Sequence, residues 1–153
     1  MRKIRVYIDT SVIGGCFDNE FLEGSNKLFE EFKSGKKIAV ISNITIYELE
    51  NAPPHVKNKL NEIPEDFIEK LSLIPEVEEL AQKYIDEKVI SNNFAEDARH
   101  IALATINKID VLASWNFKHI VNIKRIHGYN GINIKEGYNT IEIRTPKEII
   151  DED

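Results

Sequence analysis

Short apolar runs alternate along this chain with longer segments whose apolar residues recur at helical spacing. The runs at 4–8, 37–42 and 110–114 are rich in β-branched residues and have the length of strands buried on both faces. The helical segments are 25–35, 43–51, 75–87 and 92–106. Strands separated by helices pair in parallel, because a parallel connection needs a crossover that can contain a helix. The alternation therefore predicts an α/β fold, a three-layer α/β/α sandwich around a central, mostly parallel sheet.

The remaining segments are less regular. Their predicted elements are short helices broken at Pro64 in 55–71, a helix in 116–126, a turn-rich stretch in 127–139 and a strand in 140–144. A final short helix follows, because Thr145 and Glu148 have the spacing of a capping box and Pro146 occupies the first helical position. No internal repeat or linker divides the sequence. We therefore expect a single domain over 1–153.

The composition disfavours several classes of protein. The formal net charge of −6 argues against a protein that coats nucleic acid nonspecifically, but it permits an enzyme with a local basic rim. Cys16 is the single cysteine, so we expect no internal disulfide and a reducing, cytoplasmic location. No apolar stretch approaches the length that spans a bilayer, and Asp9 interrupts the start before a signal-peptide core develops. We therefore expect no membrane partner.

Three carboxylates fall at the ends of predicted elements. Asp9 directly follows the first strand, Glu48 lies in the helix after the second strand, and Asp97 lies in the first turn of the helix before the third strand. The carboxyl ends of parallel strands form the crevice where open α/β sheets bind ligands. Ser114 and Asn116, at the end of the third strand, belong to the same predicted edge. The sequence therefore predicts that these distant residues converge.

The helix that carries Asp97 has a marked beginning. Asn93 is placed to cap it, and Glu96 follows with the spacing of a capping box. Ile101 and Ala104 follow Asp97 by four and seven residues, so we expect Asp97 on the face that packs against the core. A carboxylate in that place requires compensation by a partner.

A bound cation is the compensation that the three acids suggest together. Like charges at close range raise one another's pKa unless a positive charge is added. Oxygen ligands from Asp9, Glu48 and Asp97 suit a hard divalent ion, so Mg²⁺ or Mn²⁺ is the predicted cofactor. A zinc site is not predicted, because Cys16 is alone and the four histidines are scattered. An acidic Mg²⁺ site binds phosphate oxygens and activates water for attack on phosphorus, which indicates phosphodiester hydrolysis.

Each acid also has a purely structural interpretation. Glu48 alone is an ordinary, partly exposed helix residue, and Asp9 before Thr10 and Ser11 is an ordinary turn cap. Asp97 alone would be stabilised by the macrodipole at the helix N-terminus. The metal interpretation depends on all three, because only a shared site explains why they fall at one sheet edge.

Several neighbouring residues have two interpretations as well. His100, one turn further along the helix of the third acid, either supports the site or packs in the core. Trp115 either packs at the core or stacks a base. The basic residues Lys118, Lys124 and Arg125 form either a solvated helix face or a rim that follows the phosphates of a nucleic acid.

Four stretches together resemble a PIN domain, and in order they cover nearly the whole chain. They are VYIDTSVIGG, ISNITIYELE, EDARHIALATINKIDVLASWNFKHI and IEIRTPKEII. The similarity is greatest to compact prokaryotic single-domain members, the group that includes the VapC-like toxin nucleases. On this resemblance, Asp9, Glu48 and Asp97 match the acids of the family, and His100 matches the histidine of its third acidic motif.

The resemblance implies a metal-dependent endoribonuclease whose acids hold Mg²⁺ or Mn²⁺. It implies that Asn116 belongs to the catalytic set together with the three acids, and that this set is supported by Thr10, Ser11, His100 and Ser114. It also implies that RNA is guided by Lys118, Lys124 and Arg125. Many relatives have a fourth acid where this chain has Asn116, and the neutral amide disfavours a second cation. Relatives commonly form homodimers, and the toxins among them are silenced by an antitoxin protein, so both are expected partners.

Two other functions are alternatives to the ribonuclease. A phosphatase with a nucleophilic aspartate would carry a D-x-D motif, but Ser11 stands where the second aspartate would be. A PIN-like nucleic-acid-binding module with weakened catalysis is compatible with Asn116 and with the negative net charge. Metal-dependent RNA cleavage that requires Asp9 separates the nuclease from the binding module.

Overall fold

A parallel five-stranded sheet organises the computed structural model, which describes residues 2–151, so the two ends of the predicted 1–153 domain lie outside it. The strands are β1 (Ile4–Ile8), β2 (Lys37–Ser42), β3 (Ile68–Leu71), β4 (Val111–Ala113) and β5 (Ile143–Arg144). Their order is β3-β2-β1-β4-β5, and every neighbouring pair is parallel. The α-helices are α1 (Thr10–Gly15), α2 (Leu22–Lys33), α3 (Asn43–Leu49), α4 (Pro54–Lys57), α5 (Pro75–Asp86), α6 (Ala95–Ile106), α7 (Ile123–Lys135) and α8 (Pro146–Ile149). The 3-10 helices are η1 (Asn58–Glu62), η2 (Glu65–Phe67) and η3 (Asn92–Phe94).

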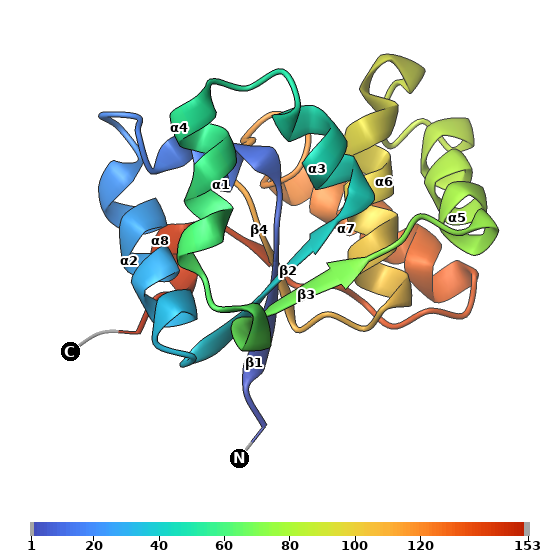
Figure 1. The fold of residues 1–153 in the computed structure, drawn as a ribbon. Helices are drawn as coiled ribbons and strands as arrows, with labels where there is room; N and C mark the ends of the chain where they lie inside the picture. The colour runs from blue at the N-terminus through green and yellow to red at the C-terminus, as the bar shows by residue number, and fades with distance from the viewer. Residues whose placement is uncertain (1, 152–153) are drawn as a thin grey trace.

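Helices cover both faces of the sheet (Figure 1). Successive side chains of a strand point to opposite faces, so Tyr7 joins a hydrophobic cluster with α5, α6 and α7, whereas Val6 and Ile8 join a second cluster with α1 and α2. The two clusters are the cores on either side of the sheet. The predicted three-layer α/β/α sandwich is therefore confirmed. Among residues 2–151, no helix combines the length and the apolar character needed to cross a bilayer.

The last third of the chain differs from the sequence-based assignment. The helix predicted at 116–126 begins only at Ile123, because the side chain of Asn122 accepts a hydrogen bond from the Arg125 amide (3.2 Å) and caps α7 there. The turn-rich assignment of 127–139 is wrong as far as Lys135, where α7 ends, and the chain turns only after that residue. In α7, Gly128 is a packing glycine: an added Cβ would lie 2.7 Å from a methyl group of Val89.

Two further assignments are corrected. Residues 68–71, expected within short helices, form the edge strand β3, where Arg5 reaches across to Glu69 with an ion pair of 2.6 Å. The predicted cap of the Asp97 helix is also wrong: Ser91 accepts from the Asn93 amide and begins η3, and Glu96 pairs with Arg99. In contrast, the capping box at the start of α8 is confirmed.

Lys37 forms a buried ion pair that joins β2 to α2. Its side chain is 3% exposed, and its ammonium group lies 2.7 Å from Glu31 and 3.0 Å from Asp151. Replacing Lys37 by alanine is expected to lower the free energy of unfolding by about 3 kcal/mol, because Glu31 keeps a buried charge without its nearest partner. The exposed Lys27–Glu23 pair provides the control, since K27A should change stability by less than about 0.5 kcal/mol. Urea denaturation of both variants measures the difference.

Candidate functional site

Asp9 lies where the chain order of the sheet reverses. β1 has β2 on one side and β4 on the other, and Asp9 directly follows its last residue. The side chain is 5% exposed and accepts hydrogen bonds from the hydroxyls of Ser11 (2.6 Å) and Ser114 (2.7 Å) and from the Val12 amide (3.3 Å). Burial raises the pKa of Asp9, and these hydrogen bonds and the charge of His100 oppose that rise. Asp9 therefore both caps α1 and presents a desolvated carboxyl group at the sheet edge.

Glu48 reaches the same edge from α3. Its Oε1 accepts a hydrogen bond from the Thr10 hydroxyl (2.8 Å) and lies 2.9 Å from His100 Nε2. Burial acts to raise the pKa of Glu48, but the hydrogen bond and charge of His100 and the Thr10 hydroxyl hold it below its ordinary value. Burial likewise opposes protonation of His100, but Tyr7, Glu48 and Asp9 raise its pKa well above the usual range. The two side chains thus form an ion pair.

The partners behind His100 were not recognised in the sequence. Tyr7 Oη lies 2.6 Å from His100 Nδ1 and 2.7 Å from Ser42 Oγ, and all three side chains are buried. Tyr7 has the sequence signature of an ordinary core strand residue, so nothing local signals this contact. Ser42 does carry a local signal, since it precedes α3 and caps it. The chain Ser42–Tyr7–His100–Glu48 fixes the glutamate from inside the protein.

Asp97 is the third acid of this edge. Asn116 Nδ2 donates to Asp97 Oδ2 (3.3 Å). The side-chain oxygen of Asn116, Oδ1, accepts from the backbone amides of Lys118 (3.2 Å) and His119 (3.0 Å). Burial is the main cause that raises the pKa of Asp97 to about 6, and the negative charges of Asp9 and Glu48 add to it. The three carboxylates are therefore close enough to repel one another.

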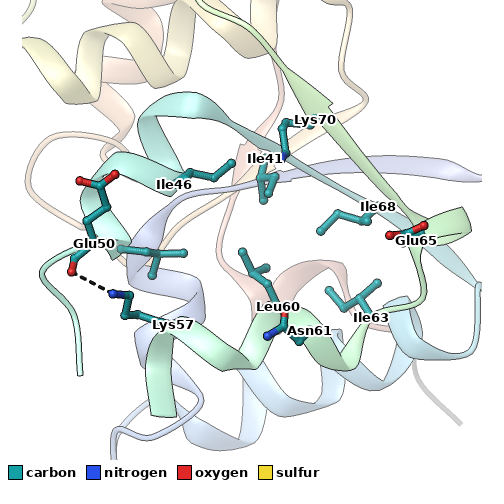
Figure 2. A pocket seen from close by; sticks show the side chains of 11 residues that line it. Ile41, Ile46, Glu50, Lys57, Leu60, Asn61, Ile63, Glu65, Ile68 and Lys70 are labelled. Carbon is teal, nitrogen blue, oxygen red and sulfur yellow. Dashed lines mark hydrogen bonds between the residues drawn. The ribbon is translucent and has the colours of Figure 1, made fainter. Parts of the chain in front are cut away.

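The structure thus brings together the acids and the side chains expected to support them. Each acid contacts one or two of these supporting residues: Thr10, Ser11, His100, Ser114 and Asn116. Their functional roles stay predictions. A cavity of about 640 Å³ between β2, β3, α3 and η1 is lined by none of the predicted site residues (Figure 2). Its walls are mainly aliphatic, so the acidic edge remains the candidate site.

The chemistry of the three carboxylates suits a divalent cation, but their present arrangement does not form a coordination site. Within residues 2–151, no three His, Cys, Asp or Glu side chains are arranged to hold a metal ion. The carboxylates instead accept hydrogen bonds from hydroxyl, imidazole and amide groups. Three oxygen donors nevertheless suit a hard cation, because its charge would offset both the burial and the mutual repulsion that raise the pKa of Asp97. Binding requires exchange of some of these hydrogen bonds for bonds to the ion.

The predicted RNA-binding residues lie together beside this edge. Lys118, Lys124 and Arg125 line one cavity of about 480 Å³. The two lysines are exposed, whereas the guanidinium of Arg125 is half-buried and donates to the backbone carbonyls of Lys118 (3.1 Å) and Val89. Arg125 therefore has a structural task, and any role in RNA binding falls mainly to the lysines.

Trp115 packs within the protein. Its ring stacks on Phe21 at 4.5 Å, and its Nε1 donates to Ser25 Oγ (2.8 Å). The neighbouring ring of Phe117, which the sequence did not single out, is 51% exposed. Phe117 is therefore the more exposed of the two aromatic residues, and these contacts favour the packing interpretation for Trp115.

Gly15 provides the space for Trp115. An added Cβ would lie 2.7 Å from both Trp115 Nε1 and Ser25 Oγ, whereas a Cβ on Gly14 would meet nothing within 4 Å. Gly15→Ala is expected to lower the free energy of unfolding by about 2 kcal/mol, because the indole must move. Gly14→Ala, one residue earlier in the same helix, should be neutral or slightly stabilising. Thermal or urea unfolding of the pair measures this, and equal stabilities would contradict it.

Two solved structures share this architecture. VapC20 of Mycobacterium tuberculosis, a sarcin–ricin loop cleaving toxin, is 13% identical over 74% of this chain and 91% of its own, with a TM-score of 0.58. VapBC2 from Rickettsia felis, solved bound to a DNA fragment from its promoter, is 15% identical over 75% of this chain and 90% of the matched chain, with a TM-score of 0.55. No protein-family model and no curated protein matches the sequence. The chain therefore has the fold of the VapC-like PIN domains.

Proposed function

We propose that this protein is a metal-dependent endoribonuclease that hydrolyses RNA phosphodiester bonds at Asp9, Glu48 and Asp97. The observation that carries the proposal is the hydrogen-bonded connection between these acids at the edge where α/β sheets bind ligands: the Ser114 hydroxyl donates to Asp9 and accepts from the Asn116 backbone amide, and the Asn116 side chain donates to Asp97. Buried carboxyl groups with a raised pKa that gather at such an edge are typical of functional sites. The described function of VapC20, cleavage of the sarcin–ricin loop, supports RNA as the substrate class.

The residues of this chain would prepare the site for a hydrolytic reaction. Asp9, Glu48 and Asp97 would hold Mg²⁺ or Mn²⁺, and a bound ion lowers the pKa of its water and neutralises charge on the phosphoryl oxygens. Ser11 and Ser114 orient the carboxyl group of Asp9 through its two oxygens. The burial of these groups strengthens their interaction with a charged substrate.

The other two acids are oriented from neighbouring elements. His100 holds Glu48, and its own ring is held by Tyr7. The side chain of Asn116 points its Nδ2 toward Asp97, because its Oδ1 already accepts hydrogen bonds from two backbone amides. We therefore assign Asn116 to positioning of Asp97. A single cation is the expected stoichiometry, since no fourth acid is present at this position.

The proposal includes the partners expected of a toxin. The fold that this chain shares with the toxin VapC20 and with VapBC2 supports an antitoxin protein as a binding partner, because toxins of this group are silenced by one. The homodimer and the cytoplasmic location stay predictions. Size-exclusion chromatography with light scattering would measure the oligomeric state directly.

A nucleic-acid-binding module with weakened catalysis is the second candidate. The observation that favours it is that, within the described part of the chain, the acids are satisfied by protein hydrogen bonds and no three ligands are arranged for an ion. Incubation of the purified protein with labelled RNA, with Mn²⁺ or with a chelator, discriminates between the two. Cleavage that requires the metal supports the nuclease, whereas binding without cleavage supports the module.

Mn²⁺ is expected to stabilise the folded protein. An ion present at one hundred times its Kd raises the free energy of unfolding by about 2.7 kcal/mol, because it binds only the folded state. Glu48→Gln should lose most of this gain, since it removes one of three charged ligands. The control is Glu50→Gln, because Glu50 is an exposed acid directly after the same helix. This variant should keep the gain in stability on addition of Mn²⁺. Thermal unfolding with and without Mn²⁺ measures the effect, and an equal gain in both variants would exclude Glu48 as a ligand.

A further inference from the structure

A basic cavity lies beside the acidic edge and is assembled from three separate segments. Its volume is about 480 Å³, and its cationic residues are Lys88, Lys118, Lys124 and Arg125. Lys88 follows α5, Lys118 lies between β4 and α7, and Lys124 lies in the first turn of α7. Lys118, Lys124 and Arg125 lie close together in the sequence, so their clustering was predictable. The fold adds Lys88, which is thirty residues away from Lys118.

The lysines of this cavity are not neutralised by the protein. Within residues 2–151, Lys88, Lys118 and Lys124 form no ion pair, in contrast to Arg5, Lys37 and Arg99. The one acid in the wall, Glu87, is paired with Lys135 at 3.2 Å. The protein as a whole carries a net charge of −6, so this is a local concentration of uncompensated positive charge.

Contacts between the three segments hold the walls of the cavity together. Arg125 ties two of the segments together by donating to the carbonyl oxygens of Lys118 and Val89. Gly128 lets α7 approach the loop after α5, because an added Cβ would lie 2.7 Å from Val89. Lys88 itself has φ +63°, a left-handed conformation that turns the chain directly after the helix. The backbone segments that carry the lysines are therefore held together by these contacts.

The cavity and the acids are joined by one short segment. The side chain of Asn116 connects them: its Nδ2 donates to Asp97, and its Oδ1 accepts from the backbone amide of Lys118. A second cavity, of about 380 Å³, shares Lys88 and Arg125 with the first and reaches Asn92, at the beginning of the segment that leads into α6. A chain bound across Asn116 would thus pass from the acids to the lysines.

We propose that this basic cavity binds a backbone phosphate of single-stranded RNA, outside the bond that is cleaved. Lys88, Lys118 and Lys124 contact the phosphate, and Arg125 is a positioning residue. The inference rests on the proposed function, and it adds the site that places the RNA strand. A flexible single strand suits this arrangement, because its backbone bends between an acidic centre and a neighbouring pocket more easily than a rigid duplex does.

Lys88 and Lys108 form a matched pair for the test. Both are exposed and both follow a helix with positive φ, +63° for Lys88 and +53° for Lys108, but only Lys88 lines the cavity. Asparagine tolerates this backbone conformation, so K88N and K108N each remove one charge with little strain. Both are made in a D9N background, and binding of a ten-nucleotide single-stranded RNA is measured over a range of salt concentrations without divalent metal.

K88N is expected to weaken binding and to reduce the slope of log K against log salt by about 0.7, the value of one lost phosphate contact to a single strand. K108N should leave both unchanged, and K88R should restore the slope. K118A and K124A should each give a loss similar to that of K88N. Equal binding by K88N and K108N, with both variants folded by circular dichroism, would overturn the inference.

The design separates this inference from the proposed function. Binding is measured in a variant that is not expected to cleave, whereas cleavage is measured in the wild-type protein. A wild-type protein that cleaves no RNA, together with a reduced slope for K88N, would leave the phosphate site standing and would remove the nuclease assignment. The reverse result would remove the phosphate site alone.

Discussion

Asp9→Asn is expected to lower the rate of RNA cleavage about 1000-fold and to leave the protein folded. Asparagine has the shape of aspartate, and the Ser11 and Ser114 hydroxyls can both donate and accept, so the hydrogen bonds around residue 9 can be kept. The loss comes from the missing charge, since stabilisation of the transition state through a bound cation amounts to several kcal/mol, and each 1.36 kcal/mol changes a rate tenfold. Single-turnover cleavage of labelled RNA with Mn²⁺ measures the effect.

The control for this substitution is Asp18→Asn. Asp18 is also an acid whose side chain accepts a hydrogen bond from a backbone amide, that of Glu20 (2.8 Å), but it is exposed. D18N should therefore cleave RNA at the wild-type rate. A D9N protein that cleaves as fast as D18N would show that the buried carboxylate at the end of β1 has only its structural role as the cap of α1.

His100→Ala is expected to have the second-largest effect, on stability and on cleavage together. The ring is 1% exposed and connects Tyr7 Oη (2.6 Å) with Glu48 Oε1 (2.9 Å). Alanine leaves a cavity and deprives both partners of a hydrogen bond, which lowers the free energy of unfolding by about 3 kcal/mol. Glu48 loses its orientation as well, and the loss of such a supporting contact lowers activity or metal affinity by about 10- to 100-fold. Urea denaturation and RNA cleavage measure the two effects.

His127→Ala controls for the loss of an imidazole, since His127 is exposed on α7. It should change neither property. The role of His100 in positioning is separated from its role in stability by titrating Mn²⁺ at a temperature where H100A is fully folded. Unchanged Mn²⁺ affinity in the folded variant would mean that His100 only supports the core.

The strands and helices that carry the acids were predictable because their signals are local. β1 and β2 appear in the structure with the predicted bounds, since a short β-branched run between turn residues is a property of neighbouring positions. The capping box of α8 was predictable for the same reason. Asp9, Glu48 and Asp97 could be assigned to one edge because parallel topology follows from the alternation of these elements, and the sheet order agrees with it.

Other features depended on contacts between distant segments. The part of α7 after residue 126 was missed because Gly128 weakens the local helical signal, although in the fold this glycine allows contact with Val89. β3 was missed because its sequence, IEKL, carries two charges, and only pairing with β2 makes it a strand. The start of α6 was misplaced because several polar residues there are equally suited to cap a helix.

The sequence by itself determined the layers of this protein and the assignment of its three acids to the ends of elements that meet at one edge of the sheet. These follow from periodicity, from capping and from residue chemistry, which act over a few positions of the chain. Only the tertiary structure decided that Tyr7 bonds His100, that Asn116 bonds Asp97 and that Lys88 lines the same cavity as Lys118. The Tyr7–His100 hydrogen bond joins residues 93 positions apart, and the Asn116–Asp97 hydrogen bond joins residues 19 positions apart. Such contacts form only when the packing of the helices and strands brings these segments together.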